Sequence, residues 1–276
     1  MNIRQACSPR EVATMDTAAL RNEFLVQNLF SKNEITLTYS HYDRMIVGGA
    51  FPLDKTLALE APAELRADFF LERREIGIIN VGGPGSISAG AENYKLDKLD
   101  CVYLGKGTQK VHFSSNSAQN PAQFFFLSSP AHRVCENRLM TAAEANPNSL
   151  GSAETANART IYKYIHPDGI ESCQLVMGLT TLENGSVWNT MPPHTHDRRM
   201  EVYCYFDVPA DQRVLHLMGR PDETRHLWME NHQAAISPPW SIHAGCGTMA
   251  YSFIWGMAGE NQSFADMDLL TLSELA

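Results

Sequence analysis

From residue 35 onwards, the chain is a succession of short β-rich runs separated by turns, and this pattern limits the folds that it can adopt. Runs of β-branched and aromatic residues bounded by Gly, Pro, Asn or Asp are typical of strands. The clearest runs cover residues 35–39, 45–47, 76–81, 102–104 and 124–127. Many short strands without intervening helices indicate β-barrels or β-sandwiches, so we predict a mostly β protein.

One helix is expected ahead of these strands. Ser8 and Glu11 have the spacing of a capping box, and Pro9 stands at the first helical position. The pattern that follows is helical as far as Leu29. We therefore predict a single N-terminal helix over residues 9–29.

The middle of the chain has the composition of a linker. Residues 141–158 are rich in Ala, Asn, Ser, Glu and Thr, and a β-rich run resumes at residues 159–165. A chain of 276 residues is long enough for two domains of ordinary size. We predict a first domain over residues 1–145 and a second over residues 146–276, each a barrel or sandwich of strands.

The strongest chemical signal is His194-Thr195-His196, followed by Glu201. Side chains two apart on a strand share a face, so both imidazoles point to one side with their Cα atoms about 6–7 Å apart. A turn at residues 197–199 leads into the β-rich run 200–206, which places the Glu201 carboxylate opposite the two histidines. Two histidines with this spacing also occur as ordinary strand residues, but the facing glutamate favours a metal site.

A fourth ligand candidate, His243, lies at the end of the Pro-containing segment 236–243. Three imidazoles and one carboxylate suit Zn²⁺, Fe²⁺, Mn²⁺, Ni²⁺ or Co²⁺ and argue against a Ca²⁺ site. We therefore predict one divalent metal site per chain, with the ligands His194, His196, Glu201 and His243.

The two predicted domains show traces of an internal repeat. Gly85-Ser86-Ile87 aligns with Gly185-Ser186-Val187 at an offset of 100 residues. In this register, the positions that correspond to His194, His196 and Glu201 are Tyr94, Leu96 and Cys101. We therefore expect the first domain to keep the strand framework and to lack the metal ligands.

The spacing His-x-His-x4-Glu with a distant histidine resembles the metal motifs of the cupin superfamily, although Trp240 stands where a glycine is common. Longer strings resemble the 5-keto-4-deoxyuronate isomerase family, and together they extend the resemblance to essentially the whole chain. These strings cover residues 191–203, 219–226, 254–262 and 266–268.

This resemblance implies a bicupin, that is, two cupin-like β-barrels preceded by an N-terminal helix. It implies a zinc ion held by His194, His196, Glu201 and His243, and a hexameric assembly. The implied reaction is the interconversion of 5-dehydro-4-deoxy-D-glucuronate and 3-deoxy-D-glycero-2,5-hexodiulosonate in pectin breakdown.

The ligand set by itself leaves two classes of reaction open. A metal ion can polarise the carbonyl of a keto-sugar while a proton moves between neighbouring carbons, or a redox metal can activate O₂. The resemblance favours the isomerisation. The alternatives are an isomerase acting on 5-deoxyglucuronate from inositol breakdown and a non-catalytic, metal-dependent sugar-acid-binding cupin.

A uronate substrate carries a carboxylate, for which arginine is a suitable partner. The two arginines in the predicted turn at residues 197–199 could equally be exposed to solvent. The candidates for substrate binding are Arg198, Arg199 and Arg225, with Arg220 as a fourth. Two residues are chemically possible as general base, although no spacing selects either of them: Glu260 and Tyr251.

Composition narrows the partners further. The net charge is −9, with 31 acidic against 22 basic residues, which disfavours nucleic acids and anionic membranes as partners. The first residues lack the apolar stretch of a signal peptide, no run approaches the length of a membrane span, and the six cysteines form no Cys-x-x-Cys pair. We expect a cytoplasmic enzyme that acts on a small uronate and forms a homo-oligomer.

Overall fold

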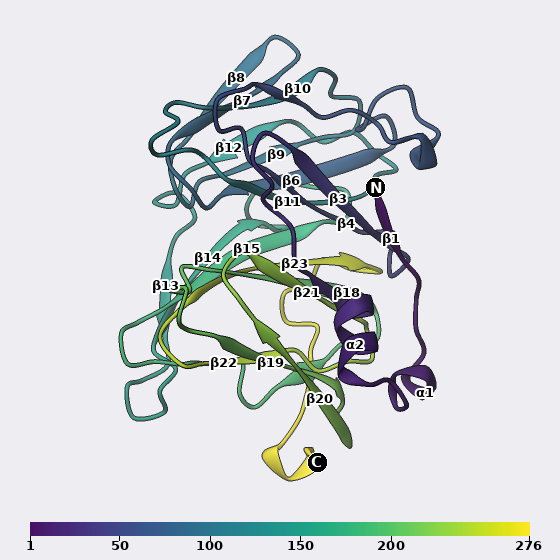
Figure 1. Cartoon of the computed structure of the whole chain (residues 1–276), viewed down its shortest axis with the longest axis vertical. Helices are drawn as coiled ribbons and strands as arrows, with labels where there is room; N and C mark the ends of the chain where they lie inside the picture. Colours follow the sequence, from purple (N-terminus) through teal and green to yellow (C-terminus); the bar gives the residue numbers. More distant parts are fainter.

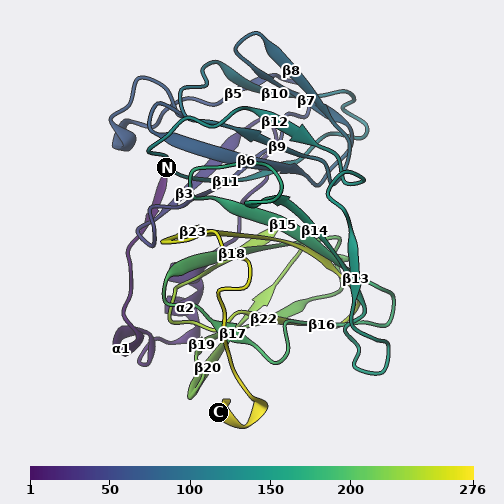
Figure 2. The same ribbon diagram turned by 180° about the vertical axis from the view of Figure 1, so that it is seen from behind.

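The computed structural model describes residues 1–276 and confirms a mostly β fold. The strands form four stacked layers, with the N-terminal half of the chain above the C-terminal half in Figure 1. Each half is built around one seven-stranded and one four-stranded sheet, and a short strand from the N-terminal segment completes the second seven-stranded sheet. In the order of the layers, a four-stranded sheet is followed by two seven-stranded sheets and then by the second four-stranded sheet (Figure 2).

The first half contains the following strands, given in their order across each sheet. The seven-stranded sheet is built of β1 (Asn2–Arg4), β3 (Ile35–Ser40), β4 (Ile46–Ala50), β11 (Phe124–Pro130), β6 (Arg74–Asn80), β9 (Cys101–Leu104) and β12 (Arg138–Met140). The four-stranded sheet is built of β5 (Leu57–Ala58), β10 (Val111–Ser115), β7 (Gly85–Ala89) and β8 (Glu92–Leu96).

The second half repeats this arrangement. Its seven-stranded sheet is built of β13 (Asn148–Leu150), β14 (Arg159–Ile165), β15 (Val176–Leu182), β23 (Ser252–Gly259), β18 (Arg199–Phe206), β21 (Gln233–Ser237) and β2 (Leu25–Val26). Its four-stranded sheet is built of β16 (Trp188–Asn189), β22 (Ala244–Gly247), β19 (Val214–Arg220) and β20 (Glu223–Met229). A small extra sheet pairs β17 (His194–Thr195) with β24 (Asp268–Leu269). Short 3₁₀ helices lie at Ala63–Leu65 and Leu272–Glu274.

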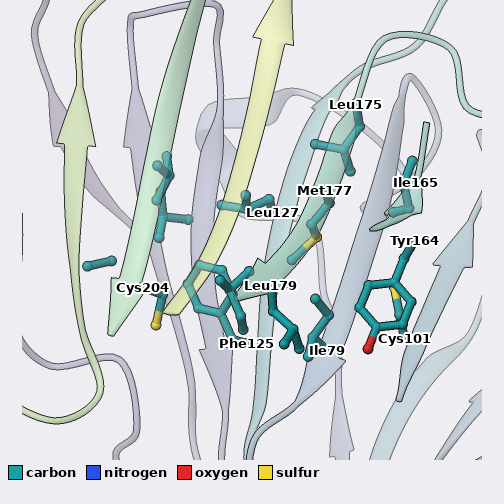
Figure 3. Packing of buried hydrophobic residues seen from close by; sticks show 14 of the residues in the cluster. Ile79, Cys101, Phe125, Leu127, Tyr164, Ile165, Leu175, Met177, Leu179 and Cys204 are labelled. Atoms are coloured by element: carbon teal, nitrogen blue, oxygen red, sulfur yellow. The ribbon is translucent and has the colours of Figure 1, made fainter. Parts of the chain in front are cut away.

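The two seven-stranded sheets pack against each other and are therefore buried on both faces. Their contact is the largest apolar cluster of the molecule, with 27 buried residues drawn from both halves. Figure 3 shows Phe125 and Leu127 of the first half beside Met177, Leu179 and Cys204 of the second. Two further apolar clusters lie inside the halves, each between a seven-stranded and a four-stranded sheet. Burial on both faces explains why these strands read as continuous apolar runs.

The strand order shows that the halves are equivalent, but the equivalence is not the one that the sequence predicted. The row Gly48–Phe126–Ile78 of the first half matches the row Gly178–Trp255–Tyr203 of the second half. In both rows a Cβ on the glycine would meet the neighbouring aromatic ring, 2.2 Å from Phe126 or 2.4 Å from Trp255. The absent side chain therefore makes room for the ring at the same place in each half.

This register corrects the predicted constant offset of 100 residues. Cys101 lies in β9, whose equivalent in the second half is β21, so it does not correspond to Glu201 of β18. The residue two before Ile78 is Ile76, which therefore occupies the place that Glu201 has two before Tyr203. The predicted match arose from local similarity and had no basis in strand pairing.

The single predicted helix over residues 9–29 is wrong beyond its start. The capping box of Ser8 and Glu11 is present, but α1 covers only Pro9–Val12. Asp16 caps a second helix, α2 (Thr17–Phe24), by accepting a hydrogen bond of 2.8 Å from the Ala19 N–H. At Leu25 the backbone becomes extended and enters β2. No helix of the protein is long and apolar enough to span a membrane.

The predicted linker is shorter than residues 141–158. The chain passes from β12 in the first half to β13 in the second between Met140 and Asn148, and β13 already pairs with β14. The N-terminal segment crosses over as well, since β2 pairs with β21 and the helices lie beside the second half in Figure 1. The boundary between residues 145 and 146 stays a prediction.

Candidate metal centre

Four buried side chains converge inside the second half. They belong to His194 at the start of β17, His196 just after it, Glu201 in β18 and His243 just before β22. Their ligand atoms lie within 4.8 Å of one another, and none of the four residues is more than 8% exposed. The predicted ligand residues are thus brought together by strands from three parts of the chain.

The alternation of β18 places the carboxylate. Met200, Val202 and Cys204 point into the layer between the two seven-stranded sheets. Glu201 and Tyr203 therefore point the other way, into the second half. The histidines do not share one long strand as expected, because β17 has only two residues, yet the His194 and His196 rings lie 5.4 Å apart.

Backbone carbonyls orient two of the imidazoles. His196 Nδ1 lies 2.9 Å from the Arg199 carbonyl oxygen, and His243 Nδ1 lies 3.3 Å from that of Ser241. A carbonyl can only accept, so both Nδ1 atoms donate to their carbonyls and both Nε2 atoms face the centre. This is the orientation of metal-binding histidines.

The distances at the centre fit a bound cation. His243 Nε2 lies 3.0 Å from His194 Nε2 and 2.8 Å from Glu201 Oε2, and His196 Nε2 lies 3.1 Å from the same oxygen. Nitrogen and oxygen acceptors at these distances repel one another unless a proton or a metal ion lies between them. Nitrogen ligands with one carboxylate suit zinc and the other first-row divalent metals.

Electrostatics support this interpretation. Burial, together with neighbouring His243, lowers the pKa of His194 to about 3, so its imidazole is neutral at physiological pH. Burial opposes a charge on Glu201, but His243 and His196 outweigh it and lower the carboxyl pKa below its usual range. Burial likewise opposes a charge on His196, yet the Glu201 carboxylate raises the pKa of that imidazole. A metal ion at the centre would therefore compete with a proton for the His196 imidazole.

A cavity of about 200 Å³ opens onto the cluster. His194, Glu201 and Tyr203 form part of its wall, beside the aromatic rings of Trp255 and Phe264. Its remaining polar and charged lining comes from Arg159, Thr180, Asn189, Thr190 and Arg199. Such a mixture of apolar walls and a few polar groups is typical of a site for a small polar ligand.

Two arginines at this wall have unused donors. Arg199 is 1% exposed and donates to the carbonyls of Ser263 and Asp266, at 2.5 and 3.0 Å, while its buried Nε has no partner. Arg159 makes one hydrogen bond, of 2.9 Å to the Asn157 carbonyl. Neither arginine is in a salt bridge. The buried amide nitrogen of Asn189 also lacks a partner.

The other predicted substrate-binding arginines lie elsewhere. Arg198 pairs with Asp266 and Asp268 at 2.7 and 2.8 Å, and so fastens the C-terminal segment rather than facing the cavity. Arg225 pairs with Glu223 at 2.8 Å and donates to the Ala13 carbonyl, outside the cavity wall. Arg220 pairs with Asp222 on the surface.

The proposed bases are not at the cavity wall either. Tyr251 is 2% exposed and its hydroxyl has no partner, but it does not line the cavity. Glu260 is exposed and lies outside the wall. Sequence reasoning missed Arg159, Asn189 and Phe264, because nothing in their local pattern signals that the fold brings them to one wall.

Paired sheets in both halves, with a buried three-histidine, one-glutamate cluster in one of them, are the features of a bicupin. Similar solved structures agree on the fold. An IolB-like protein from Salmonella typhimurium LT2 has a TM-score of 0.74 at 14% identity, covering 90% of this chain and 96% of that one. A Bacillus subtilis oxalate decarboxylase has a TM-score of 0.60 at 11% identity, covering 89% and 79%.

Sequence relatives are much closer. The 4-deoxy-L-threo-5-hexosulose-uronate ketol-isomerase of Shouchella clausii is 53% identical over 275 residues, covering 100% of both chains. The protein of the same name from Formosa agariphila is 53% identical over 272 residues, covering 99% of this chain and 97% of its own. The model of the KduI/IolB family matches residues 24–271. The chain belongs to the KduI/IolB family, which confirms the resemblance found in the sequence.

Proposed function

We propose that this protein is a metal-dependent ketol-isomerase that interconverts 5-dehydro-4-deoxy-D-glucuronate and 3-deoxy-D-glycero-2,5-hexodiulosonate in pectin breakdown. The observation that carries the proposal is the 53% identity, over the full length of both chains, to a relative that bears the name of this ketol-isomerase. The buried cluster of His194, His196, Glu201 and His243 supports it.

These four residues would hold the metal, which we propose to be zinc. A bound divalent ion supplies a Lewis acid that polarises a carbonyl oxygen and stabilises negative charge on it. The protein's contribution is to fix the imidazoles through the Arg199 and Ser241 carbonyls and to shield the centre from bulk water. The low exposure of all four ligands serves this shielding.

Arg159 is the best-placed partner for the substrate carboxylate. It lies at the cavity wall, makes one hydrogen bond and has no carboxylate partner in the protein. Arg199 is held by two carbonyls and its Nε has no partner, and the amide nitrogen of Asn189 has none either. These donors together would fix the orientation of a small polyhydroxy acid.

The aromatic side chains of the cavity wall would also contact the substrate. Burial and the nearby Glu201 carboxylate raise the pKa of Tyr203 far above its usual range. Its phenol therefore stays protonated and donates hydrogen bonds to substrate oxygens. Trp255 and Phe264 present rings against which the C–H faces of a sugar can pack while water is excluded.

The experiment that tests this function measures turnover of 5-dehydro-4-deoxy-D-glucuronate and of 5-deoxyglucuronate, with metal content by elemental analysis. We expect turnover of the first substrate, about one zinc ion per chain, and loss of both in Glu201→Gln, because an amide is a poor replacement for an anionic ligand. Turnover of 5-deoxyglucuronate alone would favour the inositol-pathway isomerase. Metal without turnover of either would favour a binding protein.

We further propose that the enzyme works in the cytoplasm as a homo-oligomer, a hexamer by resemblance to its family. All six cysteines are free, which is the usual state of thiols in a reducing compartment. Size-exclusion chromatography with light scattering would measure the assembly.

A further inference from the structure

A second and larger cavity lies in the first half, where there is no metal cluster. Its volume is about 540 Å³, which is within the range of small-molecule sites. The one group of side chains that could hold a metal lies in the second half. Ile76 also occupies the place of Glu201 in the equivalent strand. A function of this cavity would therefore not depend on the metal-binding cluster of the second half.

The lining of this cavity is cationic although the protein as a whole is acidic. Arg73, Arg74 and Lys106 line it, against a single carboxylate, Glu64. The chain carries a net charge of −9, so the local excess of positive charge runs against the average. None of the three cations takes part in a salt bridge, and their charges are free to act on a ligand.

Arg74 is the most informative of these cations. It is only 6% exposed, yet no carboxylate forms a salt bridge with it, and only the neighbouring Glu75 offsets its charge from a distance. Its Nε and Nη2 donate to oxygen atoms of Ser128 and Arg44, and its Nη1 makes no hydrogen bond. Burial lowers the pKa of Arg74 to about 10, so the side chain keeps its charge at neutral pH. A buried cation without a direct ion pair is costly, and a bound anion would reduce that cost.

The equivalence of the halves adds a second, independent argument. Arg74 begins β6 as Arg199 begins β18, and each lies two residues before the matching position of Ile76 or Glu201. Both arginines are buried, donate to backbone carbonyls and line a cavity. The first half has thus kept the arginine and the cavity and has no carboxylate ligand.

The rest of the wall suits a sugar ring. Tyr39 lies with its ring 6.0 Å from the Arg74 guanidinium, and Phe70 is part of the apolar floor. His41 and His132 also line the wall. Aromatic surface beside cationic donors is the combination that recognises a small anionic carbohydrate.

We propose that this cavity of the first half is a second binding site, for a small anionic sugar that carries a carboxylate or a phosphate. Arg74 binds the anionic group from the floor, and Arg73 and Lys106 bind it from the rim. The site is separate from the metal centre and binds its ligand without turning it over.

Isothermal titration calorimetry on the metal-loaded protein tests the proposal, with D-galacturonate and D-glucose 6-phosphate as probes and D-glucose as the neutral control. The test variant is Arg73→Gln/Lys106→Gln, which spares the buried Arg74. The matched control is Lys55→Gln/Lys95→Gln, which removes the same charge from exposed positions outside the cavity. Thermal unfolding and isomerase activity check that both variants fold.

We expect at least one anion to bind the wild type and the control equally and to bind the test variant at least tenfold more weakly, with no binding of D-glucose. Preference for D-galacturonate or for D-glucose 6-phosphate then identifies the anionic group. Equal binding to all three proteins, no binding of either anion to the wild type, or equal binding of D-glucose would overturn the proposal. Isomerase activity is measured separately, so the binding data can be interpreted even if the proposed isomerase reaction is not observed.

Discussion

The Glu75 carboxylate of the first half accepts a hydrogen bond of 2.8 Å from the backbone N–H of Leu175 in the second half. The same carboxylate accepts from the N–H groups of Cys173 and Gln174, at 2.6 and 2.8 Å. Tyr103 and Ser129 of the first half donate to it as well, at 2.6 and 3.1 Å. Glu75 is fully buried and accepts five hydrogen bonds, and the three from the second half join the halves.

We predict that Glu75→Gln lowers the free energy of unfolding by about 2–3 kcal/mol, because an amide nitrogen would face backbone donors that then lack a buried acceptor. Denaturant titration measures this loss. Tyr103→Phe removes one donor and keeps the carboxylate, so a smaller loss of about 1 kcal/mol is expected. An unfolding free energy that is the same in Glu75→Gln and wild type would contradict the role of this contact.

Arg159 and Arg225 give a matched pair for the carboxylate of the substrate. We predict that Arg159→Gln raises KM about tenfold or more and changes kcat little, because a lost charge-assisted hydrogen bond is worth about 1.5–3 kcal/mol. Arg225→Gln should leave both constants near their wild-type values, since Arg225 pairs with Glu223 outside the cavity. Steady-state kinetics on both variants tests this prediction. A larger increase in KM for Arg225→Gln than for Arg159→Gln would contradict the assignment of Arg159 as the carboxylate partner.

The two equivalent glycines allow packing and function to be separated. A Cβ at Gly178 would lie 2.4 Å from the Trp255 ring at the cavity wall, and one at Gly48 would lie 2.2 Å from Phe126 in the first half. Both alanine variants should lose about 1–3 kcal/mol of stability through overpacking. Only Gly178→Ala should also raise KM. If Gly48→Ala changed KM to the same degree, the effect would be one of general stability.

The dependence of stability on pH should include a contribution from His232. Burial lowers its pKa to about 4, and the ring packs edge-on to Phe30 with 4.9 Å between centroids. An unfolded histidine titrates near 6.5, so between these values only the unfolded chain binds the proton. Stability therefore falls as the pH drops from about 6.5 through about 4.

His232→Asn removes this titration and suits the local backbone, whose φ is 62°. Unfolding free energies at pH 7.5 and pH 5 should differ less in this variant than in the wild type. The exposed His226 provides the control, because His226→Asn should keep the wild-type pH dependence. A variant as sensitive to acid as the wild type would show that His232 is not a source of the effect.

Local signals in the sequence predicted what depends on neighbouring residues. The capping box at Ser8 and the alternation that turns Glu201 inward involve positions one to four apart, and both are present in the structure. Family resemblance and the Pro-containing turn predict His243 as a ligand, and in the structure its Nε2 lies 3.0 Å from that of His194.

The pairing of strands that lie far apart in the sequence cannot be predicted from local patterns. The offset of 100 residues compared strings of letters, whereas equivalence is set by which strands pair and where a glycine faces an aromatic ring. Arg159 reaches the cavity because β14 pairs with β15, which pairs with β23 beside the ligand strand β18. Each of these pairings is a choice among many compatible ones, and the choice is made by packing across the whole molecule.

The pairing of Leu25 with Ala235 and of Val26 with Ala234 has a consequence for biosynthesis. During synthesis, which runs from the N-terminus, β2 has no partner until β21 leaves the ribosome near the end of translation. The whole first half is complete well before then and can fold around its own core. The N-terminal segment that carries β2 therefore stays unpaired until the second half has been synthesised. Its apolar residues Leu20 and Phe24 then pack against the second half.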